Sequence, residues 1–145
     1  AAAEFTRCDV FVMCAAVCDY KPARYAEQKI KKAGEPFSLA LTPVPDILSS
    51  LTNGAHDCFV VGFAAETEEL RRHAQRKLAE KNCDLLVAND VSRNDIGMDA
   101  DENELQIFFK TGEEKKLSRA KKTQLSLALV KIILDAREKC LTKKA

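Results

Sequence analysis

The feature that most constrains the fold is an uninterrupted apolar run from Val10 to Cys18 that ends abruptly in Asp19-Tyr20-Lys21-Pro22. A run without polar alternation predicts a strand buried on both faces, as in a parallel sheet covered by helices. A carboxylate, a phenol and an ammonium group follow at its carboxyl end. Because ligands of open α/β sheets bind at this edge, we expect the functional site here.

A second part of the chain repeats the pattern of a buried strand and adds a helix. Residues 58–65 predict a buried strand, and the acidic stretch 66–69 predicts the start of a helix that extends to about Lys81. Residues 83–88 then predict a third buried strand. A strand, a helix and a strand at this spacing indicate a βαβ unit. We therefore predict an α/β fold, a Rossmann-like three-layer α/β/α sandwich with a mostly parallel sheet.

The remaining segments predict smaller elements around this unit. Residues 37–41 alternate and predict a short strand, and a short helix should open at Pro45 and run through Leu51. Residues 104–110 and 114–117 flank a Thr-Gly-Glu turn and predict a β-hairpin extension of the sheet. The last element is a helix over 118–139 with one apolar face.

The composition fits one domain over residues 1–145 and excludes several classes of function. A net charge of +1 provides no global field for nucleic acid or a membrane, and no apolar run approaches the ~18 residues of a membrane span. The six cysteines lack the spacing of a zinc site. Four of them lie in or beside predicted strands, where reduced cysteine behaves as a small hydrophobe, so we expect a cytoplasmic protein.

Several charged residues at predicted strand ends and helix starts are candidates for ligand binding. Asp19 suits a cation or a ligand hydroxyl, although a solvated turn residue explains it equally well. Lys29, with Lys31 and Lys32, can neutralise phosphate oxygens, although lysine clusters are more often plain surface. The helix start at Pro45-Asp46 offers free backbone N–H groups to an anion.

Three further residues are locally unusual. Phe63 follows Gly62 at the ligand-binding end of a buried strand and could line a nucleobase pocket, although an ordinary core position is the commoner explanation. Lys77 and Lys81 share a helical stripe with Leu70 and Ala74, where lysine is out of place unless it reaches water or serves a site. No glycine fingerprint, P-loop or catalytic triad is present. These residues favour electrostatic handling of an anionic ligand over nucleophilic catalysis.

Six short motifs in order and spacing resemble one family, phosphopantothenate–cysteine ligase (phosphopantothenoylcysteine synthetase). It is the carboxy-terminal half of the bacterial bifunctional coenzyme A biosynthesis flavoproteins, and this chain resembles an amino-terminally truncated part of it. The motifs are Ala15-Ala16-Val17-Cys18-Asp19-Tyr20, Lys29-Ile30-Lys31-Lys32, Pro45-Asp46-Ile47-Leu48, Gly62-Phe63-Ala64-Ala65-Glu66-Thr67, Lys77 with Lys81, and Ala88-Asn89-Asp90-Val91-Ser92.

The resemblance implies ligation of 4′-phosphopantothenate with cysteine through an acyl-cytidylate, with CTP as co-substrate and Mg²⁺ or Mn²⁺. It implies a catalytic role for Lys29, a metal contact for Asp19 and a mobile flap at 31–36. It also implies small-molecule substrates and a homodimer. The 104–117 hairpin would contribute to the dimer contact. FMN would bind only the amino-terminal decarboxylase half, outside this chain. The residues that would bind CTP are Met13, Cys14, Ala15, Asp19, Lys29, Pro45, Asp46, Ile47, Leu48, Phe63, Lys77 and Lys81.

The family's Ser/Gly-rich phosphate loop is not found in this sequence. The resemblance therefore implies that the isolated chain binds CTP weakly and does not complete the reaction. Two alternatives stay open at this point. One is another Rossmann-like enzyme that binds a dinucleotide, and the other is a non-catalytic dimerisation or binding module. Stabilisation by CTP alone, by NAD or by neither separates the three hypotheses.

Overall fold

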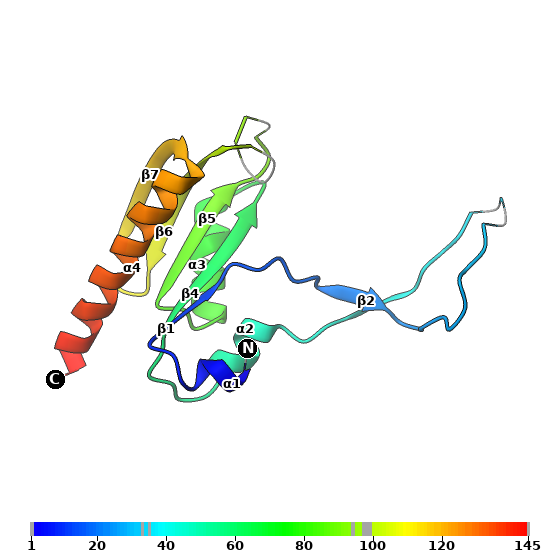
Figure 1. The fold of residues 1–145 in the computed structure, drawn as a ribbon, viewed down its shortest axis with the longest axis horizontal. Helices are drawn as coiled ribbons and strands as arrows, with labels where there is room; N and C mark the ends of the chain where they lie inside the picture. The colour runs from blue at the N-terminus through cyan, green and yellow to red at the C-terminus, as the bar shows by residue number, and fades with distance from the viewer. Residues whose placement is uncertain (1, 33, 35, 94, 97–99, 145) are drawn as a thin grey trace.

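A computed structural model describes residues 2–32, 34, 36–93, 95–96 and 100–144. It consists of a mixed sheet, helices on both of its faces, and a two-stranded extension (Figure 1). The elements in chain order are α1 (Ala2–Phe5), β1 (Val10–Met13), β2 (Tyr20–Pro22), β3 (Leu41–Pro43), α2 (Ile47–Thr52), β4 (Phe59–Glu66), α3 (Leu70–Glu80), β5 (Leu85–Asp90), β6 (Glu102–Phe109), β7 (Glu114–Lys121) and α4 (Lys122–Lys144).

The main sheet has the strand order β1-β4-β5-β6-β7. β1, β4 and β5 are parallel to one another, whereas β6 and β7 form an antiparallel hairpin that extends the sheet. Because β1, β4 and β5 run the same way, their carboxyl ends meet at one edge. The predicted three-layer sandwich with a hairpin extension is confirmed.

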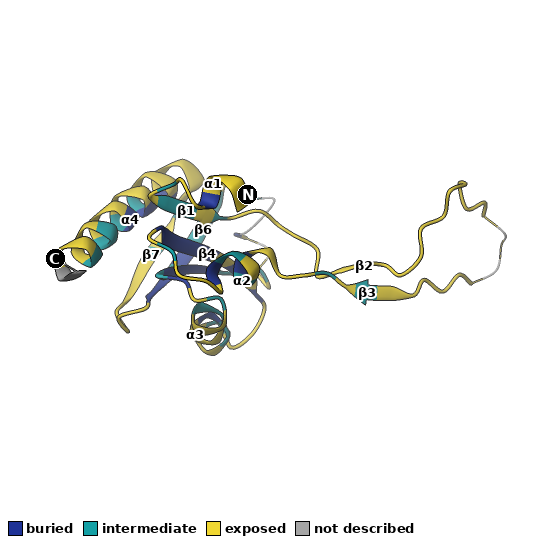
Figure 2. Cartoon of the chain, turned by 90° about the horizontal axis from the view of Figure 1, so that it is seen from below, coloured by how far each residue is buried: buried dark blue, intermediate teal, exposed yellow. Residues whose placement is uncertain are grey.

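Alternate residues of β4 and β5 supply two cores, one on each face of the sheet. Val60, Ala64 and Leu86 pack with Leu48 of α2 and Ala74 of α3 on one face. On the other face, side chains of the same strands pack against α4, and Figure 2 shows the buried strands between α3 and α4. Successive side chains of a strand point to opposite faces of the sheet. Because both faces are covered here, neither set of side chains is exposed, which explains the long apolar runs of β4 and β5. The strand residues of the second core are Phe59, Val61, Leu85, Val87, Leu105, Ile107 and Phe109.

The expected strand over residues 10–18 is wrong in length and in burial. β1 ends at Met13, its residues are half-buried apart from the exposed Val12, and residues 14–18 are exposed and form no strand. β1 pairs with β4 alone among the described strands, so its outer edge has no neighbour. Beyond Met13 the side chains are mostly small. These residues do not pair in the sheet, and most of them line a cavity.

Three other boundaries differ from the sequence prediction. The short strand lies at Leu41–Pro43 instead of 37–41, because it pairs with β2 outside the main sheet and so has no buried face. The α3 helix begins at Leu70, since β4 keeps its pairing with β5 through Glu66. The α4 helix begins at Lys122, since β7 extends to Lys121 in the hairpin.

Residues 20–43 form an extension that we call the arm, which contains β2, β3 and the segment between them. The arm projects away from the sheet and its helices (Figure 1). Two backbone hydrogen bonds outside the ladder close it, from Ala23 N to Ala40 O and, just beyond its base, from Val44 N to Asp19 O, both 2.9 Å. No described helix is long and apolar enough to cross a membrane.

Candidate functional site

A cavity of about 500 Å³ lies where the carboxyl ends of β1 and β4 meet the amino end of α2 and the base of the arm. Its volume is in the range of small-molecule sites, and its position is the edge where ligands of open α/β sheets bind. All the predicted nucleotide-binding residues except Cys14 and Lys29 line it. They are Met13, Ala15, Asp19, Pro45, Asp46, Ile47, Leu48, Phe63, Lys77 and Lys81.

The amino end of α2 is built around Asp46, which is the N-cap and not the second helical residue that the sequence suggested. Its Oδ1 accepts a hydrogen bond from the Ser49 amide at 2.9 Å, and its Oδ2 is paired with the Lys81 ammonium group. Lys81 follows α3 and lies at its far end, yet its long side chain reaches the start of α2. Asp46 therefore holds a lysine at the cavity wall.

Burial alone would raise the pKa of Asp46, but hydrogen bonds from Lys81 and from the Ser49 amide outweigh it and lower this pKa below its ordinary value. A carboxyl with a lowered folded-state pKa stabilises the fold above its unfolded pKa of about 3.9. That contribution is fully present at neutral pH and is lost as the pH falls through the lowered folded-state pKa.

Asp46→Ala is expected to lower the free energy of unfolding by about 1 kcal/mol at pH 7, because α2 loses its cap. Asp46→Asn is the matched control, since asparagine caps a helix as well as aspartate but carries no charge for Lys81. The asparagine variant should lose no more than about 0.5 kcal/mol, the contribution of an exposed ion pair. Urea unfolding at pH 7 and pH 3 measures both, and equal losses for the two variants would contradict the capping role.

Glu66 is a residue that the sequence analysis missed. It ends β4, is 8% exposed, and its Oε1 lies 2.8 Å from Lys77 Nζ in an ion pair without hydrogen-bond geometry. Its Oε2 lies 3.3 Å from His73 Nδ1. A buried carboxylate is costly unless it is paired, so Glu66 fixes the position of Lys77. The available signal was a charged residue directly after the apolar run of β4.

Phe63 and Gly62 are consecutive residues of β4 and point to opposite faces of the strand. Phe63 is 37% exposed, so it offers an apolar wall instead of filling the core. Gly62 is buried between α2 and β5, where an added Cβ would lie 2.9 Å from Leu86 Cδ1 and 3.4 Å from Leu48 Cδ2. Gly62 therefore allows α2, and the cavity residue Leu48, to pack closely on the sheet.

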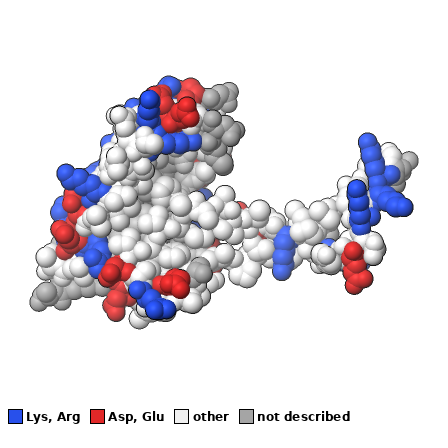
Figure 3. All heavy atoms as spheres, in the orientation of Figure 1, with Lys and Arg blue, Asp and Glu red and all other residues white. Residues whose placement is uncertain are grey.

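Two predicted residues do not line the cavity. Cys14 is exposed beside it, and Lys29 lies in the arm between β2 and β3, exposed to solvent. The predicted flap at 31–36 lies partly outside the described residues. The arm is rich in basic side chains, as Figure 3 shows toward its tip; Lys21, Arg24, Lys29, Lys31 and Lys32 belong to it. The arm therefore carries positive charge but leaves Lys29 away from the cavity of its own chain.

The described residues contain no cluster of three metal-ligating side chains. Mg²⁺, however, usually binds through only one or two carboxylates together with water and substrate phosphates. Asp19 lines the cavity, and no side-chain partner occupies its carboxylate among the described contacts, whereas Asp46 is paired with Lys81. The residues present thus fit a metal ion that arrives with a nucleotide.

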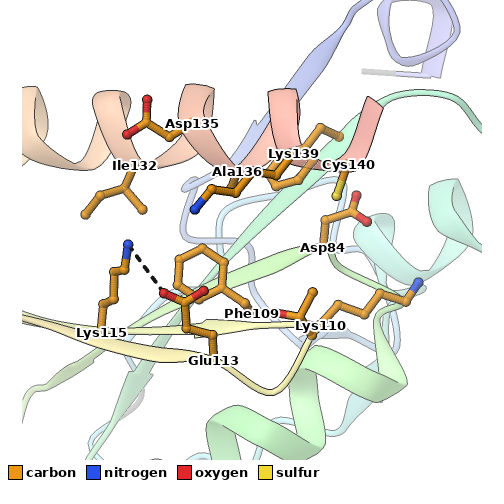
Figure 4. A pocket seen from close by; sticks show the side chains of 12 residues that line it. Asp84, Phe109, Lys110, Glu113, Lys115, Ile132, Asp135, Ala136, Lys139 and Cys140 are labelled. Carbon is orange, nitrogen blue, oxygen red and sulfur yellow. Dashed lines mark ion pairs between the residues drawn. The ribbon is translucent and has the colours of Figure 1, made fainter. Parts of the chain in front are cut away.

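A second cavity, of about 380 Å³, lies at the opposite edge of the sheet between α4 and the β6–β7 turn. Figure 4 shows Phe109 and Ile132 within it, with charged side chains of both signs around them, among them the ion pair of Lys115 with Glu113 at 3.4 Å. Asp84, which also lines it, accepts a hydrogen bond from the Val60 amide at 2.8 Å and so supports β4. Among the described residues, three lysines and three carboxylates line this cavity, and two lysines and two carboxylates line the first one, so net charge does not distinguish the two.

A mainly parallel sheet between helical layers, with a polar cavity at the carboxyl ends of its strands, defines a Rossmann-like α/β domain. Residues 1–136 match the family model "DNA/pantothenate metabolism flavoprotein C-terminal domain", and the chain belongs to that family. It is 46% identical over 133 residues to the coenzyme A biosynthesis bifunctional protein CoaBC of Haemophilus influenzae, a match that covers 91% of this chain and 33% of that protein.

Other relatives agree with this assignment. CoaBC of Bacillus subtilis is 39% identical over 125 residues, which cover 86% of this chain and 31% of that protein. A crystal structure of the C-terminal domain of CoaBC gives a TM-score of 0.71 at 27% identity, covering 94% of this chain and 59% of that one. A Cab2 mutant in complex with phosphopantothenate-cysteine shares the fold, with a TM-score of 0.73 at 17% identity, covering 93% of this chain and 46% of that one. The chain spans about a third of the length of the curated relatives it matches.

Proposed function

We propose that this chain carries the CTP-binding part of a phosphopantothenate–cysteine ligase of coenzyme A biosynthesis. The observation that carries the proposal is the convergence of the predicted nucleotide-binding residues on one cavity at the carboxyl ends of β1 and β4. The family assignment and the CoaBC relatives support it. The full reaction is proposed only for a protein of the relatives' length, because the match covers 33% of the Haemophilus protein. The isolated chain is expected to bind CTP without completing the ligation.

In the proposed reaction, the carboxylate of 4′-phosphopantothenate attacks the α-phosphate of CTP and releases pyrophosphate. The amine of cysteine then attacks the acyl-cytidylate and releases CMP. This chemistry requires positioning and charge neutralisation more than a protein nucleophile. Phe63 offers a wall for the cytosine ring, and Ile47 and Leu48 at the start of α2 also line the cavity. Lys77 and Lys81 supply positive charge for the phosphates. A divalent cation held at Asp19 would add charge neutralisation at the phosphates.

We propose that Lys29 acts from the arm of a second copy of the chain. The arm exposes large apolar side chains, including Tyr25 (90% exposed) and Phe37 (67% exposed), which a monomer would leave in water. The family resemblance predicts that the 104–117 hairpin contributes to a dimer contact. The free edge of this hairpin is β7, whose lysines and arginine disfavour pairing with a second strand edge. In a two-fold dimer each arm can lie over the partner's body and bring Lys29 to its cavity.

Nucleotide selectivity tests the proposed function. In a thermal-shift assay with Mg²⁺, CTP should raise the melting temperature of the chain, whereas equal concentrations of ATP and NAD should raise it far less. At 100 times the Kd, a ligand stabilises the fold by about 2.7 kcal/mol, which is readily measured. Stabilisation by NAD alone would favour a dinucleotide enzyme, and no effect of any nucleotide at millimolar concentration would favour a binding module.

Mixing two variants tests whether Lys29 acts in the partner's site. Lys29→Gln and Lys77→Met should each weaken CTP binding. If Lys29 acts across the dimer, an equal mixture refolded together regains about a quarter of the strong sites, because mixed dimers contain one site with both lysines. If Lys29 acts within its own chain, or if light scattering shows a monomer, the mixture regains none and the arrangement across the dimer is wrong.

A further inference from the structure

Two cysteine thiols lie in contact at the amino ends of β1 and β4, at the sheet edge opposite the candidate CTP site. The Sγ atoms of Cys8 and Cys58 are 3.2 Å apart, although the residues are 50 positions apart in the sequence. Parallel pairing brings them together, because the strands align Val10 with Phe59 and the Phe59 amide donates to Asp9 O at 2.9 Å. Both cysteines are free thiols.

Packing around Phe5 of α1 holds this pair in place. Phe5 is 4% exposed, and its ring meets Phe11 and His56 edge-on, with centroids 5.2 and 5.3 Å away. Cys8 Sγ lies 3.5 Å from the carbonyl oxygen of Phe5. Cys8 and Cys58 lie in the segments just before β1 and β4, and strand register and a packed aromatic cluster bring their sulfur atoms together.

The two thiols differ in accessibility, and Cys58 is a weak acid. Cys8 is half-buried, whereas Cys58 is buried. Burial, the hydrogen bond with Cys8 and the nearby charges of Cys8, Asp84 and Asp9 raise the pKa of Cys58 to about 12. Since the thiolate is the nucleophile in thiol–disulfide exchange, Cys58 is a poor first reactant, and Cys8 is the thiol that an outside reagent meets.

We propose that Cys8 and Cys58 form a redox-active thiol pair that a small-molecule disulfide, such as oxidised glutathione, converts into an intramolecular disulfide. Cys8 first attacks the small-molecule disulfide, forms a mixed disulfide and releases one thiol. Cys58 then attacks Cys8 Sγ and releases the second thiol. The two cysteines lose two electrons and two protons, and the small-molecule disulfide gains both, so the exchange is balanced.

The product would tie β1, an edge strand of the described sheet, to its neighbour β4. A bond between residues this far apart in sequence restricts the unfolded chain and raises stability. The carboxyl ends of the same strands, which line the candidate CTP site, keep their positions. Oxidation is therefore expected to raise the melting temperature and to leave CTP affinity within about twofold, as expected for a change that spares the binding contacts.

Peptide mapping of the intact chain tests the proposal. The folded protein is treated with oxidised glutathione, the remaining thiols are alkylated, and a non-reducing digest is analysed by mass spectrometry. The linked Cys8–Cys58 peptide should be the main internal disulfide, and dithiothreitol should abolish both this peptide and the gain in melting temperature. Cys14→Ser/Cys18→Ser is the matched control, because it removes two exposed thiols and should leave the linked peptide unchanged.

Cys8→Ser and Cys58→Ala distinguish the two steps. Cys58→Ala should stop at a glutathione adduct on Cys8, whereas Cys8→Ser should leave Cys58 unmodified in the folded protein. The proposal is overturned if glutathione modifies Cys8 in the unsubstituted chain without forming the linked peptide. It is also overturned if the linked peptide appears only in urea. None of these outcomes depends on CTP binding, so the proposed function can fail separately.

Discussion

Lys77→Met is expected to weaken CTP binding at least tenfold and to destabilise the fold by about 2 kcal/mol. The loss of affinity follows from removing a charged contact to phosphate, which contributes about 1.5–3 kcal/mol. The loss of stability follows from Glu66, whose buried Oε1 lies 2.8 Å from Lys77 Nζ and would lose its counter-charge. Methionine keeps the length and apolar stem of lysine, so the substitution tests the charge. Isothermal titration and urea unfolding measure the two effects.

Glu66→Gln and Lys116→Met are the controls for this prediction. In the Glu66→Gln background, Lys77→Met should cost less stability, because no buried charge is left unpaired; a double-mutant cycle measures the difference. Lys116 pairs with Glu104 at 3.0 Å on the exposed side of the hairpin, and its replacement should change stability by no more than about 0.5 kcal/mol. Additive losses for Glu66 and Lys77 would contradict the account of their pairing.

Gly62→Val is expected to lower the free energy of unfolding by about 3 kcal/mol. Even a single Cβ at this position would lie 2.9 Å from Leu86 Cδ1 and 3.1 Å from Cys83 Sγ, and both residues are fully buried, so neither can move aside cheaply. Leu48 would also be displaced, which should disturb the start of α2 and reduce CTP affinity.

Gly54→Ala is the matched control for Gly62, since a Cβ there would meet no atom within 4 Å. This substitution should change the free energy of unfolding by less than about 0.5 kcal/mol. Urea unfolding with an unchanged m-value makes the comparison. If Gly62→Val is as stable as the unsubstituted chain, the close packing of α2 on β4 is wrong.

The sequence predicted the sheet better than the segments outside it. The buried strands β4 and β5 are long apolar runs because both faces are covered, and that pattern can be read locally. The run at 10–18 misled because a doubly covered strand is not the only environment that has an apolar pattern. Its first residues belong to an edge strand and its later ones line a cavity, and both environments accept apolar side chains. The strand β2 was not predicted because it pairs only with β3 and has no buried face.

Asp19 and Pro45-Asp46 were candidates because they follow a predicted strand or begin a predicted helix, whereas most of the other cavity residues were named through the family resemblance. Their meeting in one cavity depends on the topology, which brings parallel strand ends to one edge. Glu66 was missed because its importance comes from burial beside Lys77, a long-range contact that no local pattern records. The distance of Lys29 from the cavity was missed because a loop residue's position depends on where the chain leaves the sheet.

The central claim is that CTP binds in the cavity at the carboxyl ends of β1 and β4. The most direct measurement is an NMR titration of the ¹⁵N-labelled chain with CTP and Mg²⁺. The account predicts that the largest amide shifts occur at Ala15, at residues 46–48 and at Phe63. Shifts concentrated instead at Phe109, Lys110 and Ile132, which line the opposite cavity, or no shifts at millimolar CTP, would contradict it.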